Sequence, residues 1–427
     1  MKKSTNILAT ILVTGALVMQ STITCAQSGT APTEAIRPFK VHFTDTELKD
    51  LRSRIKATKW PDTETVKDES QGVRLGTMQK LADYWSTGYD WRKIEAKLNT
   101  LPQFITKIDG VDIHFIHVRS KHPNALPIII THGWPGSIIE QIKVIDPLIN
   151  PTAYGGKAED AFDVVIPSLP GYGFSGKPTD LGWTPVRVAK AWIELMNRLG
   201  YKKYVAQGGD WGNAISETMA LIAPPALIGI HTNMPATVPS EISTALASGV
   251  MPAGLSPDEQ NAFKQLGYFY SKGLGYALEM GNRPQSLYGI ADSPIGLAGW
   301  MLDHDIRSYE LIARVFEGQK EGLTKDDILD NITLYWLTNT AISSARLYWE
   351  TTQNSTGGGF FDPRKVQIPV AVSVYPDEIY AAPKNWAEKA YPNLIHYNKL
   401  NKGGHFAAWE QPDFFVQELR DSFKSLR

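Results

Sequence analysis

Segments with the pattern of strands and segments with the pattern of helices alternate along residues 126–234, and this alternation limits the fold more than any other feature of the sequence. The strand-like stretches are LPIIIT, FDVVIPSLPG, KYVAQ and LIGIHTNM, and helix-like stretches such as TPVRVAKAWIELMNRLG lie between them. The continuous apolar run from Ile128 to Ile130 is typical of a strand that is buried on both faces. Alternating strands and helices form a mostly parallel sheet with helices on both faces. We therefore predict an α/β fold.

The alternation stops after the first part of the core and resumes near the end of the chain. Residues 235–361 have the pattern of helices broken by Gly and Pro, whereas VAVSV and LIHYNKL are again strand-like and PDFFVQELRDSFKSL closes the chain as a helix. A helical block inserted between strands of one sheet is typical of a cap domain. We therefore expect a core in two parts, residues 101–234 and 362–427, with a cap at 235–361.

A helical region precedes the core at residues 27–100. Thr44 and Glu47 have the spacing of a capping box at the start of one amphipathic helix, and YWSTGYDWRKIEAKLN is a second amphipathic piece. The next stretch, FITKIDGVDIHFIHV, has a period of two and predicts a hairpin that turns at Asp109 and Gly110. We expect residues 27–100 to form a helical extension of the core.

The first 26 residues have the pattern of a secretory signal. Two lysines precede an apolar stretch from Ile7 to Met19, and small and polar residues end at Thr24-Cys25-Ala26. We expect cleavage after Ala26 and export to the periplasm or the medium. The apolar stretch is short for a transmembrane helix, and the residues before Cys25 do not favour lipidation, so we expect no stable membrane anchor. Cys25 is the only cysteine, so a chain cleaved after Ala26 contains no disulfide.

The charge of the chain is balanced, with 43 Lys and Arg residues against 44 Asp and Glu residues. An excess of positive charge that would bind nucleic acid or an anionic membrane is therefore absent from the sequence. No group of His and Cys residues has the sequence spacing of a metal site, and we expect neither a metal nor a cofactor. The composition leaves the oligomeric state open.

The stretch QGGDWGN, residues 207–213, follows a strand-like segment and precedes a helix-like one. Small residues at 208 and 212 flank Asp210 at the spacing of a nucleophile elbow, the turn that carries the nucleophile of α/β-hydrolases, with Asp in place of Ser. An Asp before a helix is also a common cap. The preceding strand, the flanking small residues and the absence of a G-x-S-x-G sequence favour a nucleophile. Ser175 in GYGFSGKP lacks the second glycine and is interpreted as a loop residue.

The remaining catalytic groups follow Asp210 in the order nucleophile, acid, histidine that α/β-hydrolases use. Asp377 and Glu378 come directly after the strand-like VAVSV, and His405 lies beside two glycines in NKGGHFAAWE. A carboxylate nucleophile displaces a leaving group from a saturated carbon and becomes an ester, which water activated by a histidine then hydrolyses. The sequence therefore predicts an alkylating substrate, either an epoxide or an alkyl halide.

Hydrolysis of such an ester develops an oxyanion, which needs backbone donors already in place. The residue after the nucleophile, Trp211, supplies one N–H group. The HGWPGS turn that follows the buried strand supplies the other, from Trp134. An opened epoxide also develops an alkoxide, and a tyrosine hydroxyl can donate a proton to it.

Four motifs, HGWPGS, LPGYGFSGKP, GGDWG and GGHFAAWEQP, resemble the core motifs of the microsomal-type epoxide hydrolase family, and the N-terminal helical region resembles the start of the same family. The resemblance covers nearly all of the chain beyond the signal. It implies an α/β-hydrolase fold and the conversion of an epoxide to a vicinal diol by water. It also implies Asp210 as nucleophile, His405 as general base and Glu378 as the acid that orients the histidine, with the adjacent Asp377 as the rival.

The family also uses two cap tyrosines that hydrogen-bond to the epoxide oxygen, and the resemblance places them at Tyr276 and Tyr348. An aromatic-rich cap favours a lipophilic epoxide of moderate size. One alternative is a haloalkane dehalogenase, which has the same Asp-Trp elbow but typically has Asn where this chain has Trp134. The other is a ligand-binding protein that keeps the fold without the chemistry, and the complete set of Asp, Glu and His argues against it.

Overall fold

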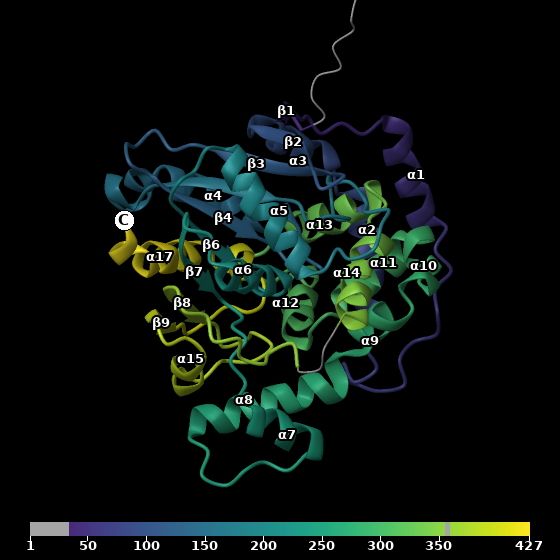
Figure 1. Cartoon of the computed structure of the whole chain (residues 1–427). Helices are drawn as coiled ribbons and strands as arrows, with labels where there is room; N and C mark the ends of the chain where they lie inside the picture. Colours follow the sequence, from purple (N-terminus) through teal and green to yellow (C-terminus); the bar gives the residue numbers. More distant parts are fainter. Residues whose placement is uncertain (1–33, 355–358) are drawn as a thin grey trace, which may run out of the picture. The chain divides into compact units, whose positions relative to one another are not determined.

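A single mixed sheet forms the centre of the computed structural model, which describes residues 34–354 and 359–427 (Figure 1). Within these residues nine strands pair in the order β1-β2-β3-β5-β4-β6-β7-β8-β9. Their bounds are β1 (Arg37–Pro38), β2 (Gln103–Ile108), β3 (Val111–Val118), β4 (Leu126–Thr131), β5 (Phe162–Pro167), β6 (Tyr204–Gly208), β7 (Leu227–Thr232), β8 (Val370–Val374) and β9 (Leu394–Lys399). The predicted signal, residues 1–26, lies outside the described residues.

The sheet is antiparallel at one edge and parallel over the rest. Strands β1, β2, β3 and β5 pair antiparallel, whereas every pairing from β5 through β4, β6, β7 and β8 to β9 is parallel. The predicted mostly parallel α/β fold is confirmed. The hairpin turn is also confirmed, because Asp109 (φ 48°) and Gly110 (φ 81°) join β2 to β3 with the two positive φ angles of a type I′ turn.

Strand β4 is the point at which the strand order reverses, because the chain continues to β5 on one side and later to β6 on the other. Its isoleucines 128–130 have no exposed surface, as the apolar run predicts. Sites in open α/β sheets lie beyond the carboxyl ends of the strands at such a reversal. The loops after β4 and β6 are therefore the expected place for chemistry.

Two groups of helices cover the sheet. Helices α5 and α6 pack against each other in one group, and α4, α16 and α17 pack together in the second. Helix α15 contacts the edge strand β9. The bounds are α4 (Ile142–Ile149), α5 (Pro185–Arg198), α6 (Trp211–Ile222), α15 (Lys384–Ala390), α16 (Ala407–Glu410) and α17 (Pro412–Ser422).

The inserted block between β7 and β8 is helical, as the sequence predicts. It contains α7 (Ser240–Ser248), α8 (Pro257–Tyr268), α9 (Gly275–Asn282), α10 (Tyr288–Asp292), α11 (Pro294–Leu302), α12 (Ile306–Phe316), α13 (Lys325–Leu337) and α14 (Ala341–Gln353). In Figure 1, α9 to α14 lie beside the sheet and α7 and α8 lie at the bottom of the view. Among residues 34–354 and 359–427, no helix is both long enough and apolar enough to cross a membrane.

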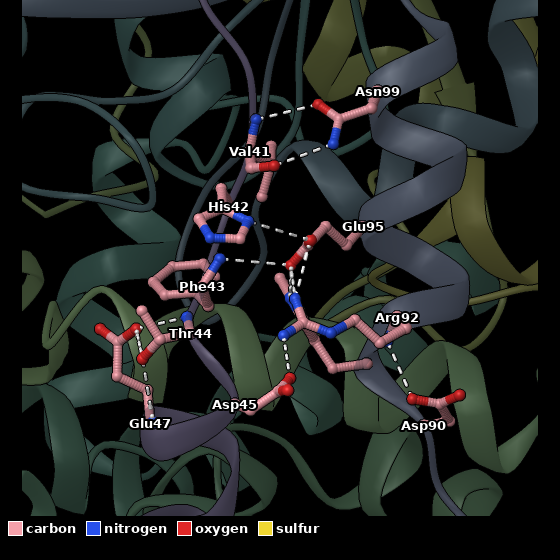
Figure 2. A network of polar contacts seen from close by, with 11 residues as sticks. Val41, His42, Phe43, Thr44, Asp45, Glu47, Asp90, Arg92, Glu95 and Asn99 are labelled. Atoms are coloured by element: carbon pink, nitrogen blue, oxygen red, sulfur yellow. Dashed lines mark hydrogen bonds and ion pairs between the residues drawn. The ribbon is translucent and has the colours of Figure 1, made fainter.

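The N-terminal region contains α1 (Asp45–Lys56), α2 (Leu75–Thr87) and α3 (Trp91–Thr100), and its extended lead-in is tied to α3 (Figure 2). The Asn99 side chain exchanges two hydrogen bonds with the backbone of Val41, at 2.9 and 2.8 Å. The Glu95 carboxylate accepts from the backbone N–H of Phe43 at 3.3 Å and from Arg92 at 2.8 Å. These bonds satisfy backbone groups of the lead-in through side chains of α3.

Two details differ from the sequence prediction. The stretch YWSTGYDWRKIEAKLN spans two helices, because α2 ends at Thr87 and α3 begins at Trp91. Gly88 is the C-cap of α2, and the Asp90 side chain caps α3 by accepting from the N–H of Arg92 at 3.1 Å. The short strand β1 was not predicted, because two residues carry no periodic pattern and pair only once β2 is in place.

Candidate active site

The sharp turn between β6 and α6 carries Asp210 in a strained conformation, with φ 50° and ψ −128°. Small residues are required on both sides of it. A Cβ atom on Gly208 would lie 2.0 Å from the carbonyl oxygen of Gly212, and one on Gly212 would lie 2.0 Å from that of Thr131. The close approach of strand and helix therefore explains the sequence spacing of the elbow. A positive φ at a residue with a side chain costs about 1–3 kcal/mol and is typical of functional sites.

The turn after β4 supplies a backbone donor to this aspartate. Thr131 at the end of β4 pairs with Gly208 at the end of β6, which brings the two following loops together. The Trp134 N–H then donates to Oδ1 of Asp210 at 2.8 Å. Trp211 begins α6 directly after Asp210, so its N–H belongs to the first helical turn, where backbone donors have no partner within the helix. The Trp134 donor thus reaches the Asp210 carboxylate, and the role of the Trp211 N–H stays a prediction.

Helix α13 of the cap holds the turn after β4 in place. The Asn331 side chain donates to the carbonyl oxygen of Pro135 at 2.8 Å and accepts from the Ser137 hydroxyl at 2.7 Å. The Tyr335 hydroxyl donates to the carbonyl oxygen of Gly136 at 2.7 Å. These groups are buried, so each bond would be costly to leave unmade. The position of the Trp134 donor therefore depends on the cap.

The N-terminal region supports the same helix from its other side. The Trp85 indole on α2 donates to the Thr333 hydroxyl of α13 at 2.9 Å, and the Tyr89 hydroxyl donates to the Asp330 carboxylate at 2.7 Å. Trp85, Tyr89 and Thr333 are buried. A continuous set of contacts thus runs from α2 through α13 to the turn beside Asp210.

The predicted histidine and acid lie together on the loops after β9 and β8. Nδ1 of His405 lies 2.7 Å from Oε1 of Glu378, and both side chains are buried. Asp377 is exposed, and its backbone forms a bridge with Gly404. Of the two adjacent carboxylates, the structure therefore brings Glu378 to the histidine. Asn233, at the end of β7, donates to Oε2 of Glu378 at 3.5 Å and was not predicted.

His405 is cationic in the resting protein. Burial by itself lowers the pKa of His405, but the carboxylates of Glu378, Asp210 and Asp305 together outweigh burial and raise the pKa to about 10. A histidine in this state must release a proton before it can act as a base. Loss of the Asp210 charge, as in the ester that the sequence predicts, would remove one of the three carboxylates and so favour that release.

The two predicted cap tyrosines, Tyr276 on α9 and Tyr348 on α14, both lie against the tryptophans next to Asp210. Tyr276 stacks on Trp134 with ring centroids 4.8 Å apart, and Tyr348 meets the Trp211 ring edge to face at 4.8 Å. The two tyrosine rings are 5.9 Å apart. Burial, with the charge of Asp210 next, raises the pKa of each well above the ordinary value, so both hydroxyls keep their protons. Within the part of the chain that the structure describes, the buried Tyr348 hydroxyl has no hydrogen-bond partner.

A cavity of about 30 Å³ touches both Asp210 and His405. The polar residues Gln207, Asn233 and Glu140 also line it. A space of this size holds one or two water molecules rather than an organic substrate. Burial raises the pKa of Glu140 to about 8, although the charge of His405 lowers it, so this carboxyl is mainly protonated at neutral pH. Sequence reasoning missed Glu140 because nothing distinguishes it from any Glu of a helix-like stretch.

His304 is a further buried residue at the site that the sequence did not reveal. It lies in the loop between α11 and α12, and its ring centroid is 4.4 Å from that of His405. Potential ligand atoms of Asp210, His304 and His405 all lie within 4.8 Å of one another. The three residues are far apart in the sequence, so no motif could have grouped them.

The fold and the site together define the class of the protein. A nucleophile elbow, a buried acid and a histidine follow one another along the chain, on loops that extend from a mostly parallel sheet. This arrangement defines an α/β-hydrolase.

Similarity to known proteins identifies the family within the α/β-hydrolases to which the chain belongs. Residues 36–141 match the family model described as epoxide hydrolase N terminus, and residues 127–286 match that of the alpha/beta hydrolase fold. A Stigmatella aurantiaca protein whose name assigns it to the epoxide hydrolases is 50% identical over 92% of this chain and 86% of its own length. Epoxide hydrolase 1 of Sus scrofa is 34% identical over 91% of this chain and 89% of its own length.

A solved structure gives the same result. The juvenile hormone epoxide hydrolase of Bombyx mori superposes with a TM-score of 0.80 at 30% sequence identity, covering 92% of this chain and 95% of its own. The chain belongs to the microsomal-type epoxide hydrolase family, and the predicted family, fold and enzyme class are confirmed. The roles of the individual site residues stay predictions that their geometry supports.

Proposed function

We propose that the protein hydrolyses a lipophilic epoxide to a vicinal diol through an ester on Asp210. The observation that carries the proposal is the 2.8 Å bond from the Trp134 N–H to Oδ1 of Asp210. This bond fixes one carboxylate oxygen beside the oxyanion donors and leaves Oδ2 to attack. Oδ2 forms a bond to an epoxide carbon as the carbon–oxygen bond of the ring breaks. The released oxygen takes a proton from Tyr276 or Tyr348, whose hydroxyls remain protonated.

The second step regenerates the carboxylate. His405 gives up its extra proton once Asp210 is neutral, and this proton replaces the one that the tyrosine donated. Neutral His405, oriented by Glu378, then takes a proton from a water molecule in the small cavity, and that water attacks Cγ of Asp210. The negative charge of the intermediate develops on Oδ1, where the Trp134 and Trp211 N–H groups stabilise it. As the Cγ–Oδ2 bond breaks, the leaving diol oxygen takes the proton of the new hydroxyl on Cγ, so Asp210 returns as a carboxylate that keeps the water oxygen and His405 keeps the proton it took from water.

Trapping of the ester tests the proposal. His405→Gln removes the base but not the nucleophile, so we expect an adduct of the mass of the whole epoxide to accumulate on Asp210. Peptide mass spectrometry after exposure to a panel of epoxides and a matched panel of alkyl halides measures it, and the double variant Asp210→Asn/His405→Gln is the control. An adduct formed only with halides would indicate dehalogenation. Adducts with neither panel would contradict the covalent mechanism and favour a binding protein.

The nature of the substrate and the location of the protein are part of the same proposal. The aromatic side chains of Trp134, Trp211, Tyr276, Tyr348 and Phe360 face one another around the site, which favours an apolar epoxide. Export after cleavage at Ala26 rests on the sequence pattern, and its role would be to destroy reactive epoxides outside the cytoplasm. Intact-mass measurement on the native protein tests export, because a retained N-terminus would contradict it.

A further inference from the structure

His304 takes no part in the proposed reaction, although it is buried against the catalytic groups. Its ring contacts those of His405, Tyr276 and Trp134, with centroids 4.4, 5.0 and 5.8 Å away. Nε2 of His304 is buried and has no hydrogen-bond partner among residues 34–354 and 359–427. An imidazole nitrogen left in that state normally costs about 1–3 kcal/mol. The atom is therefore available to a ligand at the site.

Both histidines are oriented by a carboxylate through the same ring atom. Nδ1 of His405 lies 2.7 Å from Glu378, and Nδ1 of His304 lies 3.0 Å from Oδ2 of Asp305. Asp305 is itself fixed, because it caps α12 by accepting from the N–H of Ser308 at 2.8 Å. In each pair Nε2 is the ring atom left to bind something else, and at His405 a metal ion must displace the proton that this ring carries in the resting protein. A carboxylate on the far nitrogen is the arrangement that fixes histidine ligands of transition metals.

We propose that Asp210, His304 and His405 bind a divalent transition-metal ion such as Zn²⁺. Their ligand atoms lie within 4.8 Å of one another, so an ion at the centre of the three is at most about 2.8 Å from each. Inward shifts of about 0.7 Å then give the usual Zn–N and Zn–O bond lengths of about 2.0–2.2 Å. Two imidazoles and one carboxylate leave one position of a tetrahedral ion for water.

The donor set also determines which cations fit. Imidazole nitrogen binds Zn²⁺, Co²⁺, Ni²⁺ and Cu²⁺ well, whereas Ca²⁺ and Mg²⁺ need mainly oxygen ligands. Asp210 is the single oxygen ligand among the three side chains, so we expect selectivity for the transition metals. Binding does not depend on the proposed reaction, because the three side chains hold the ion whether or not they open epoxides.

The bound ion has two consequences. It occupies the nucleophile and the base together, so it inhibits the enzyme. It also joins the cap, through His304, to the core, through Asp210 and His405, and an ion that binds only the folded chain raises its stability. Inhibition and stabilisation should therefore appear over the same range of metal concentration.

The test uses the full chain without a polyhistidine tag, first treated with a chelator. Calorimetric titration with Zn²⁺ should show one ion per chain, and Co²⁺ should give the visible absorption of a tetrahedral nitrogen and oxygen site. His304→Gln should weaken Zn²⁺ binding by at least about 10-fold. His42→Gln, which alters an exposed histidine, is the matched control and should bind as the wild type does. Thermal unfolding with and without Zn²⁺ measures the stabilisation.

Equal Zn²⁺ affinity in the wild type and His304→Gln, or no binding to the wild type, would overturn the proposal. If His304→Gln fails to fold, Asp305→Asn takes its place, because Asn keeps the helix cap but not the carboxylate on His304, and it should weaken Zn²⁺ binding by about 10-fold. These measurements involve no epoxide. Failure to trap an ester on Asp210 would therefore count against the proposed reaction and leave the metal site standing.

Discussion

The core side and the cap side of the site are held by different means. Glu378 and His405 lie on loops after strands and are fixed by hydrogen bonds to each other, and Asp210 is fixed by the Trp134 N–H. The cap tyrosines are fixed by ring packing, and the Tyr348 hydroxyl has no hydrogen-bond partner among the described residues. Groups that carry charge before the substrate binds are thus already paired. In the proposed reaction Tyr348 acts on charge that develops later, and its hydroxyl is left open to an epoxide oxygen.

The largest expected effect comes from a substitution on the core side of the site, where the charged groups are already paired. Glu378→Gln keeps the size of the side chain but removes the charge that orients His405, so ester hydrolysis should slow by about 10²–10⁴-fold while alkylation of Asp210 continues. Asp377→Asn is the matched control, because Asp377 is exposed and its change should alter the rate less than about 2-fold. Rapid-mixing measurements of the two half-reactions check this. Equal losses in both variants would mean that the acid is misassigned.

A smaller effect is expected from a substitution on the cap side of the site. Tyr348→Phe should slow alkylation by about 10–100-fold, because a donor to the epoxide oxygen is lost. It should also raise the free energy of unfolding by about 1 kcal/mol, since a buried hydroxyl without a partner is removed. Tyr335→Phe is the control, because its hydroxyl donates to Gly136, and it should lower the free energy of unfolding by about 1–2 kcal/mol.

Denaturant unfolding and single-turnover alkylation measure these two variants. A fall in stability in Tyr348→Phe would show that this hydroxyl has a partner in the free protein. The distinction between paired groups on the core side and an unpaired hydroxyl on the cap side would then be wrong.

The smallest effect concerns the charge that links the two half-reactions. Asp210→Asn mimics the neutral ester, so the pKa of His405 should fall below its value of about 10 in the wild type. Because this pKa is raised on folding, its contribution to stability is complete below about pH 6.5 and is lost as the pH rises through 10. The loss should be smaller in Asp210→Asn. NMR titration of the imidazole signals measures the pKa, and equal values in both proteins would contradict this coupling.

Sequence reasoning located the groups whose local surroundings leave a pattern. Asp210 needs small neighbours because α6 starts against β4, and that need is visible as glycines at 208 and 212. Glu378 and His405 follow strands, so their end of the sheet was predictable. His304 and Glu140 left no such trace, since they reach the site only when α11, α12 and the turn after β4 dock together. A single sequence carries no local pattern for contacts between segments that are far apart along the chain.

The bonds from α13 to the turn after β4 have a consequence for protein engineering. A chimera that exchanges the whole cap with that of a relative would also exchange Asn331 and Tyr335, which hold the turn, and would separate α13 from its contacts on α2. The unit that can be exchanged without disturbing the oxyanion donors is therefore smaller than the cap. For design purposes, α13 belongs with the N-terminal region rather than with the rest of the cap.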